Sequence, residues 1–330
     1  DATTGLSLEA TDLDVGLRLH LPDVEVHEEG ELVVPAARLL SVARESDDEE
    51  TTLVGDDGNL KLDTGRSHFR IRGEDPDGFP EIPSFQDDGV IRLPGDTLRT
   101  MIRRTVFATA KEAGRYALHG VLFRVSGDRL ELVATDGRRL ARTVRTLDAP
   151  AERDLKVIVG PKGLSLLDRV MGAQTGEVAV SLEDRQVLFQ IGGTLVISRL
   201  IDGTFPAYED VIPKATTGSF ALGVTDFAGA LRRASLLTTR DAMSVQFDID
   251  ADLLKIKSRA PEVGEARVEV PIAYDGDKRL LGFNPAFLGE ALKVMDPDGE
   301  VRFEFTDAKA PGKLTDGDDY VYVIMPIALE

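Results

Sequence analysis

Alternating apolar and polar residues recur along the chain in ordered blocks. One kind of block predicts a strand, a tight turn and a second strand, and its clearest examples contain EATDLD and VATDGR. The other kind combines a short apolar run, a small-residue turn and an apolar stripe of helical period. The strand pairs are predicted at residues 5–18, 128–142 and, more weakly, 252–267, and the strand–helix blocks at residues 32–43, 157–170 and 280–292.

A further helix precedes two of these strand pairs. Residues 91–110 and 220–239 share a pattern in which a short strand leads into an amphipathic helix. Alternating strands follow each strand–helix block, and the aromatic–proline turns FPEIPSF and FPAYEDVIP close two of the copies. Repetition at this period predicts an α+β fold of three pseudo-repeated units of about 120 residues, each made of two βαβββ-like halves. The expected bounds are 1–88, 89–216 and 217–330.

Fewer residues precede the ATD turn in the first unit than in the second. Ten residues precede Thr11, whereas about 45 residues of the second unit precede the matching Thr135. We therefore expect the first unit to lack its N-terminal strand and helix, a segment of roughly 35 residues.

Composition restricts the classes of protein that are possible. The chain of 330 residues is 42% apolar and 29% charged, which is typical of globular domains with a substantial core. The absence of cysteine excludes disulfides, thiolate metal sites and cysteine nucleophiles. No apolar run approaches the ~18 residues that span a bilayer, and no secretory signal is recognisable. We expect no membrane association and a cytoplasmic location.

The net charge of −19 argues against a uniformly basic nucleic-acid binder, but the basic residues are gathered on predicted helices. Residues 97–111 and 227–240 contain no acid, although 58 acids in 330 residues predict about two or three in each window. A single helix of this kind is best explained as a solubilising face. Recurrence on equivalent helices favours one positive surface that binds phosphates without reading bases. The candidate DNA contacts are Arg38, Arg44, Arg99, Arg103, Arg104, Lys111, Arg115, Tyr116, Lys162, Arg169, Arg232, Arg233, Arg240 and Lys293.

No arrangement of catalytic or metal-binding residues is recognisable. The four histidines have no ligand spacing, and Asp12 and Asp136 fit turn positions better than catalytic or metal-binding roles. Nucleophile elbows, phosphate loops and dinucleotide fingerprints are absent. The acidic run at residues 47–50 is typical of a solvated loop. We expect a non-catalytic protein with no cofactor and no metal, and a carboxylate-dependent hydrolase has only scattered acids in its favour.

The C-terminal segment VYVIMPI, residues 321–327, is strongly apolar. One interpretation is a last strand packed inside a sheet. The other is that half of its side chains form the wall of an apolar cleft, which is typical of sites for short peptides with apolar anchors. Because Pro326 interrupts the ladder, Met325 and Ile327 are expected to project from the sheet edge.

Five segments identify a family resemblance. RYALHGVLF, LVATDGRRLA, LIDGTFPAYEDVIP, GFNPAFL and YVIMPI occur in this order and resemble the bacterial DNA polymerase III beta subunits, the sliding clamps. The resemblance runs along the whole chain. It implies a ring of two head-to-tail subunits, with sheets outside and helices around a central hole for duplex DNA. It also implies a non-catalytic processivity factor that tethers the polymerase III catalytic subunit and is opened by a clamp loader.

The family's peptide-binding cleft lies between its second and third domains. Carried over by motif, the cleft residues are Leu118, Thr135, Gly137, Arg139, Leu140, Pro206, Val211, Asn284, Phe287, Val323, Ile324, Met325, Pro326, Ile327 and Leu329. Asp210 stands where the family often has a basic residue, and Ile327 replaces a commoner methionine. The implied partners are duplex DNA, a second copy of the chain, and proteins with short apolar clamp-binding peptides. The alternative is a repeat-built peptide-binding scaffold that does not encircle DNA.

Overall fold

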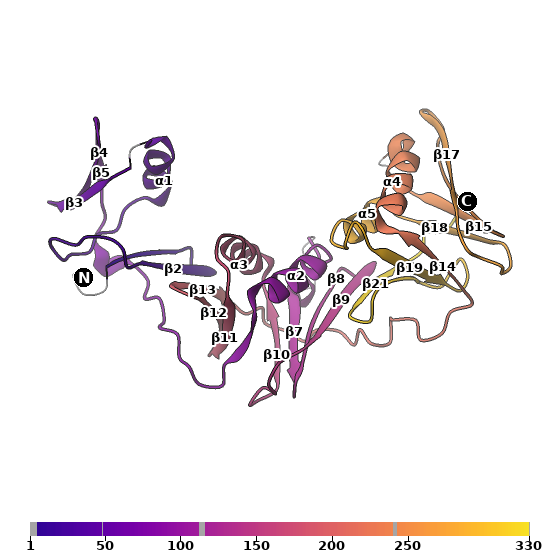
Figure 1. Ribbon diagram of the computed structural model, residues 1–330, viewed down its shortest axis with the longest axis horizontal. Coiled ribbons are helices and arrows are strands. Elements are labelled where there is room, and N and C mark those ends of the chain that lie inside the picture. Colours follow the sequence, from indigo (N-terminus) through magenta and orange to yellow (C-terminus); the bar gives the residue numbers. More distant parts are fainter. Residues whose placement is uncertain (1–4, 48, 112–115, 240–242, 330) are drawn as a thin grey trace.

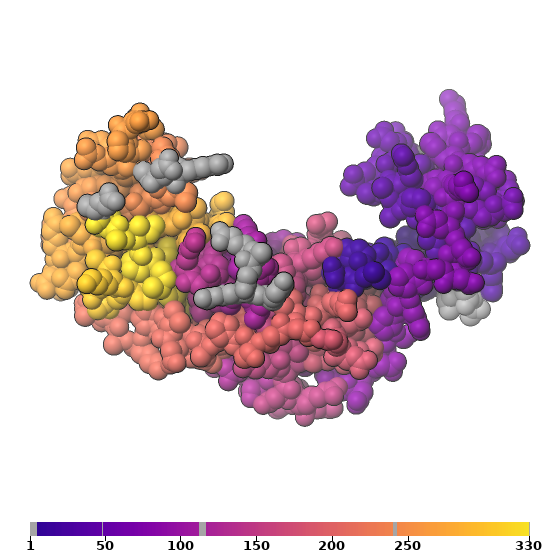
Figure 2. Space-filling model, turned by 180° about the vertical axis from the view of Figure 1, so that it is seen from behind, coloured from indigo at the N-terminus to yellow at the C-terminus, as the bar shows by residue number. Residues whose placement is uncertain are grey.

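The computed structural model describes residues 5–47, 49–111, 116–239 and 243–329. Figure 1 shows an open arc, with the helices on its inner side and the sheets on its outer side. Figure 2, seen from behind, shows the two ends of the arc separated by an open concave side. The expected α+β class, with sheets outside and helices inside, is confirmed.

The first unit lies at one end of the arc. It contains β1 (Leu6–Thr11), β2 (Val15–Leu21), α1 (Ala36–Glu45), β3 (Thr52–Asp56), β4 (Asn59–Thr64), β5 (Ser67–Arg72) and the 3-10 helix η1 (Pro76–Gly78). The predicted strand pair and the predicted helix are therefore present. β3, β4 and β5 form a separate antiparallel sheet. Helix α1 buries none of its residues, and its Leu40 is 49% exposed.

The second and third units repeat one order of elements. The second contains β6 (Ile91–Pro94), α2 (Gly95–Val106), η2 (Tyr116–His119), β7 (Val121–Ser126), β8 (Arg129–Thr135), β9 (Arg139–Thr146), β10 (Leu155–Val159), α3 (Pro161–Ala173), β11 (Glu177–Glu183), β12 (Gln186–Ile191) and β13 (Thr194–Arg199). The third contains β14 (Gly218–Gly223), α4 (Val224–Ala234), η3 (Ser235–Leu237), β15 (Val245–Asp250), β16 (Leu253–Ala260), β17 (Gly264–Pro271), β18 (Arg279–Phe283), α5 (Pro285–Leu292), β19 (Glu300–Phe305), β20 (Gly312–Asp316) and β21 (Tyr320–Ile324).

Local sequence explains where these helices begin and which face they bury. Helix α2 buries Leu98, Met101 and Ile102, which recur at helical spacing. Helix α5 begins with Pro285 after Asn284, whose side-chain oxygen accepts a hydrogen bond from the Ala286 N–H at 2.9 Å. A side-chain N-cap followed by proline at the first position is a strong start signal, worth about 1 kcal/mol for the cap alone.

Two sheets cross the junctions between units. One has the order β1-β2-β13-β12-β11-β6, and the other has the order β10-β7-β8-β9-β21-β20-β19-β14. At the first junction β2 pairs with β13, so that Gly16 lies opposite Ile197. At the second junction β9 pairs with β21, so that Leu140 lies opposite Val323. The expected unit bounds fall in the connectors between β5 and β6 and between β13 and β14.

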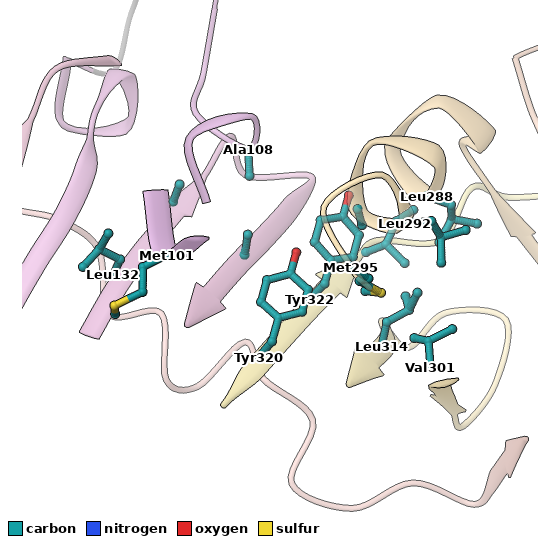
Figure 3. Packing of buried hydrophobic residues seen from close by; sticks show 14 of the residues in the cluster. Met101, Ala108, Leu132, Leu288, Leu292, Met295, Val301, Leu314, Tyr320 and Tyr322 are labelled. Carbon is teal, nitrogen blue, oxygen red and sulfur yellow. The ribbon is translucent and has the colours of Figure 1, made fainter. Parts of the chain in front are cut away.

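The main hydrophobic core also crosses the second junction. It joins α2 and α3 to the sheets of the second unit and continues into the phenylalanine-rich interior of the third. Figure 3 shows Tyr320 and Tyr322 of β21 between Met101 and Ala108 on one side and Leu288 and Leu292 on the other. Both tyrosine side chains are fully buried. The second and third units therefore share one hydrophobic core instead of having two separate cores.

Candidate functional site

The helices lie on the inner side of the arc (Figure 1), and several of them carry exposed basic residues. They come from α1, α3 and α4, from the segment after α2, and from the residue that ends α5. Within the part of the chain that the structure describes, none of them pairs with a carboxylate. These residues are Arg38, Arg44, Lys111, Arg169, Arg232, Arg233 and Lys293. Seven cations without carboxylate partners, on or next to the helices of the concave side, could attract a polyanion despite the overall negative charge.

Arg99 and Arg103 on α2 share one carboxylate from α3. Asp168 accepts hydrogen bonds from Arg99 at 3.1 Å and from Arg103 at 2.6 Å. Burial alone would raise the pKa of Asp168, but these two guanidinium groups outweigh burial and lower it. The Arg103 side chain remains 52% exposed, so it is accessible to a phosphate although it shares Asp168.

Arg104 points away from the inner face. Its side chain is only 12% exposed and forms ion pairs with Asp316 at 2.6 Å and Asp319 at 3.4 Å. Its guanidinium carbon also lies 5.1 Å from the ring centroid of Tyr320. All three partners belong to the third unit, so Arg104 fastens α2 to the β20–β21 turn. This corrects the expectation that Arg104 is available to DNA.

The remaining basic candidates divide into two groups. Lys162 forms an ion pair with Asp12, which joins α3 to the turn after β1 across the first junction. Arg115 and Arg240 lie outside the described residues, and for Tyr116 only the backbone is described, within η2.

The candidate peptide cleft stands on a small apolar cluster at the second junction. Ile158, Leu122 and Val133 lie opposite one another on β10, β7 and β8. Leu140 and Val323, opposite each other on β9 and β21, extend this row on the same face, displaced by two residues along the strands. Phe205 and Tyr208, from the connector after β13, cover this row. The cluster is separate from the main core, because it lies on the other face of the same sheet.

The candidate cleft residues separate into a buried base and an accessible wall. The base consists of Leu118, Thr135, Arg139, Leu140 and Val323, all at most 8% exposed, whereas Ile324 is fully buried in the main core on the opposite face of the sheet. The accessible wall contains Val211, Met325 and Ile327, which are 44%, 39% and 36% exposed, together with the exposed Pro206 and Gly137. Asn284, Phe287, Pro326 and Leu329 are half-buried between the two. Direct ligand contact is thus open to the wall and the half-buried set, whereas the base supports them.

The two ATD turns are built alike. Gly137 N–H donates to Thr135 Oγ1 at 3.1 Å, and Leu13 N–H donates to Thr11 Oγ1 at the same distance. Asp136 Oδ1 accepts two backbone N–H groups, as Asp12 Oδ1 does in the first turn. Both carboxylates are therefore used to close turns, as expected.

Arg139 connects the second unit to the third beneath the cleft. It forms ion pairs with Asp136 and with Glu290 of α5, and donates to the Phe107 carbonyl at 2.8 Å. Its guanidinium carbon lies 4.3 Å from the ring centroid of Phe287. Burial alone would lower the pKa of Arg139, but the hydrogen bond to Glu290 and the nearby negative charge raise it. Arg139 is thus a positioning residue and not a contact surface.

Sequence reasoning missed the polar network that holds the connector over the cleft. The Tyr208 hydroxyl donates to Glu131 Oε2 at 2.5 Å, and Glu131 also pairs with Arg142. Burial, followed by the bond to Glu131, raises the pKa of Tyr208 well above its ordinary value. Tyr208, three residues after Phe205, was the available sequence signal for this network. Its partner Glu131 lies 77 residues away in the sequence, so the pairing could not be predicted.

No group of three or more metal-ligating side chains occurs within residues 5–47, 49–111, 116–239 and 243–329. In the same ranges, no helix has the length and apolar character needed to cross a membrane.

Comparison with known proteins places all three units in one family. The DNA polymerase III beta subunit models match in chain order: N-terminal domain at residues 2–83, central domain at 92–207 and C-terminal domain at 209–328. The beta sliding clamp of Pseudomonas aeruginosa is 33% identical over 330 residues, covering 98% of this chain and 89% of that protein. The beta sliding clamp of Vibrio cholerae is 30% identical, with the same coverage.

Solved structures agree with the sequence comparison. The DNA polymerase III beta subunit of P. aeruginosa superposes with a TM-score of 0.90 at 31% identity, covering 98% of this chain and 89% of that one. The beta subunit of Thermotoga maritima gives a TM-score of 0.91 at 26% identity, covering 99% and 89%. The chain therefore belongs to the DNA polymerase III beta subunit family, the beta sliding clamps.

Proposed function

We propose that this protein is a DNA sliding clamp: a non-catalytic subunit that encircles duplex DNA as a head-to-tail homodimer and tethers the replicative polymerase. The observation that carries the proposal is the placement of cationic helices from all three units on one concave side (Figure 1). Such a surface holds the phosphate backbone of any sequence. A location in the cytoplasm, at the replicating chromosome, follows from this role.

Retention on circular DNA separates the ring from the alternative scaffold. After loading onto nicked circular duplex, the ring is expected to stay bound at high salt and to slide off once the circle is cut. The physical reason is topological, since enclosure does not depend on ion pairs that salt screens. Gel filtration of the DNA complex before and after linearisation provides the measurement. Dissociation at the same rate from closed and cut circles would instead favour the scaffold.

The inner cations are expected to set the salt dependence of direct DNA binding. Changing Arg232 and Arg233 to serine should reduce the slope of log affinity against log salt by up to ~2 per subunit, about 0.9 for each lost phosphate contact. Titration of short duplex DNA followed by anisotropy measures this slope. Arg259→Ser is the matched control, because Arg259 is exposed on β16, on the face of the strand that points away from α4. An equal effect of both variants would contradict an inner binding face.

The two ends of the arc carry apolar residues that fit a head-to-tail contact. Leu53, Val54 and Phe69 are 42%, 44% and 37% exposed on the sheet of β3, β4 and β5. At the other end Leu236 and Val263, beside β17, are 73% and 53% exposed. Two different ends that meet twice close a two-subunit ring. β3 and β17 are edge strands, each paired with one neighbour and unpaired on its outer side, which suits such a contact.

Leu236→Asp is expected to convert the dimer to a monomer at micromolar concentration, because the new carboxylate would be buried at the seam without a partner. Sedimentation velocity measures the change. Leu13→Asp serves as the control, since Leu13 is 68% exposed but lies at the first junction, away from both ends. A wild-type monomer at that concentration would count against ring closure.

We further propose that the wall formed by Pro206, Val211, Met325 and Ile327 binds short apolar peptides of the polymerase III catalytic subunit, the clamp loader and other partners. Support comes from the exposure of these four residues above a rigid apolar base. Asp210 is exposed beside Val211, which favours peptides without an acid at that position.

A further inference from the structure

A hollow of about 90 Å³ lies where the first unit joins the second. Its walls come from the turn between β1 and β2, from the connector after η1, and from strands β12 and β13. Nothing in the sliding-clamp role proposed above uses this place. It occupies, in the first junction, the position that the candidate peptide cleft occupies in the second.

The equivalence of the two places rests on matching backbone geometry. The Thr11 and Thr135 turns have the same internal hydrogen bonds. Each turn leads into a strand that pairs with a strand of the following unit. A connector crosses the sheet at both junctions: Phe79, Ile82 and Phe85 cover the first, as Phe205 and Tyr208 cover the second. The first junction is therefore a second copy of the same construction.

One substitution opens the hollow. Leu140 fills the second junction, but Gly16 stands at the matching position of the first, opposite Ile197. A β-carbon at Gly16 would have its nearest neighbours at 3.5 Å, on Ile197, and 3.9 Å, on Ile82, which is ordinary contact. Ile82 of the connector approaches this position, and the hollow remains open beside Gly16, which forms part of its lining.

An exposed leucine stands at the mouth of this space. Leu13 lines the hollow, is 68% exposed, and has a φ of 76°, a left-handed conformation that leucine rarely adopts. Gly137 has the equivalent position in the second turn, with a φ of 87°. A glycine at position 13 would adopt this backbone conformation without strain. Leucine there provides apolar surface at the cost of backbone strain.

The charges around the hollow are mainly negative. Asp14 and Glu81 are exposed lining residues, and neither forms an ion pair within the part of the chain that the structure describes. Arg199 also lines the hollow and, like the two carboxylates, forms no ion pair within the described residues, so the charged side chains of the lining carry a net charge of about −1. The two free carboxylates are complementary to a cationic partner.

We propose that this hollow is a second peptide-binding site, which takes a branched aliphatic side chain flanked by basic residues from a partner protein. Size favours a particular anchor: a cavity of ~150 Å³ accepts benzene, so about 90 Å³ suits an isobutyl group better than an aromatic ring. Asp14 and Glu81 select the flanking charge. Only the choice of a peptide as ligand rests on the proposed function of the cleft at the second junction.

Methyl NMR of the full chain tests the proposal with acetyl-Lys-Leu-Lys-amide as the probe. The δ1 methyl of Ile197 is expected to shift saturably, with at least about tenfold weaker binding for acetyl-Glu-Leu-Glu-amide and for acetyl-Lys-Phe-Lys-amide. Equal affinity for the acidic analogue, or no shift at Ile197, overturns the proposal. A shift that follows protein concentration without peptide assigns the hollow to a second copy of the chain and also overturns it.

Two variants and one control make the result specific to the hollow. Gly16→Leu fills the space as Leu140 does, and Leu13→Gly removes the wall while easing the backbone, so loss of the Ile197 shift in the folded Leu13→Gly protein supports the site. Val211→Asp, at the second junction, should leave the Ile197 shift unchanged. A peptide shift at Ile197 but none at Ile327 would contradict the cleft while retaining the hollow; the reverse pattern would contradict the hollow alone.

Discussion

Arg139→Met is expected to lower the free energy of unfolding by about 3–5 kcal/mol, the usual cost of removing one partner from a buried ion pair. The Arg139 side chain is 4% exposed, and its loss leaves Asp136, Glu290 and the Phe107 carbonyl without their shared donor. At roughly 2–4 °C per kcal/mol, the melting temperature should fall by at least about 6 °C. Differential scanning calorimetry of the protein measures the change, which should appear in the transition that includes the second and third units, since one core joins them.

The neighbouring Arg138 provides the matched control for this prediction. Its side chain is exposed and has no ion-pair partner within the described residues, so Arg138→Met should change stability by no more than about 0.5 kcal/mol. Adding Glu290→Gln to Arg139→Met should restore part of the loss, because it removes the orphaned carboxylate. Similar melting temperatures for the Arg138 and Arg139 variants would refute the role of Arg139 as the connection between units.

Val211→Asp and Ile327→Asp are each expected to weaken binding of the cognate polymerase III catalytic subunit at least thirtyfold, or about 2 kcal/mol. Each change places a charge on the accessible wall, where an apolar anchor would have to desolvate it. Surface plasmon resonance with immobilised polymerase subunit measures the affinity. Because both residues lie at the surface, the melting temperature should stay near that of the wild type.

Val24→Asp is the control for this pair. Val24 is 39% exposed in the first unit, close to the 44% of Val211, but it takes no part in the cleft. Its affinity for the polymerase subunit should equal that of the wild type. If Val24→Asp weakened binding as much as Val211→Asp, the loss would reflect surface charge in general, and the cleft assignment would fail.

Helices and strands were accessible to sequence reasoning because their signals are local. The stripe of Leu98, Met101 and Ile102 specifies α2, and Asn284 followed by Pro285 marks the start of α5. The projection of Met325 and Ile327 beyond the last strand likewise agrees with a proline after that strand. These features need only neighbours within one or two turns of chain.

Partners brought together from distant parts of the sequence were not accessible. The acid-free window around Arg103 predicted free cations, but Asp168 reaches Arg103 from another helix, 65 residues away. Arg104 finds Asp316 at a separation of 212 residues. Nor does alternation alone reveal that β9 pairs with β21, so the position of Val323 opposite Leu140 beneath the cleft could not be anticipated. Charge counting along a chain cannot distinguish an available arginine from an occupied one.

The pairing of β2 with β13 and of β9 with β21 also has a mechanical consequence. Each junction is closed by five consecutive residue pairs, so bending there would break a run of backbone hydrogen bonds together. A subunit should consequently behave as a rigid body. A gap wide enough to admit duplex DNA should therefore open at the contact between the two subunits of the proposed ring. In the proposed ring, a clamp loader would therefore act most effectively by separating the two subunits at that contact, because a rigid subunit transmits an applied force to it.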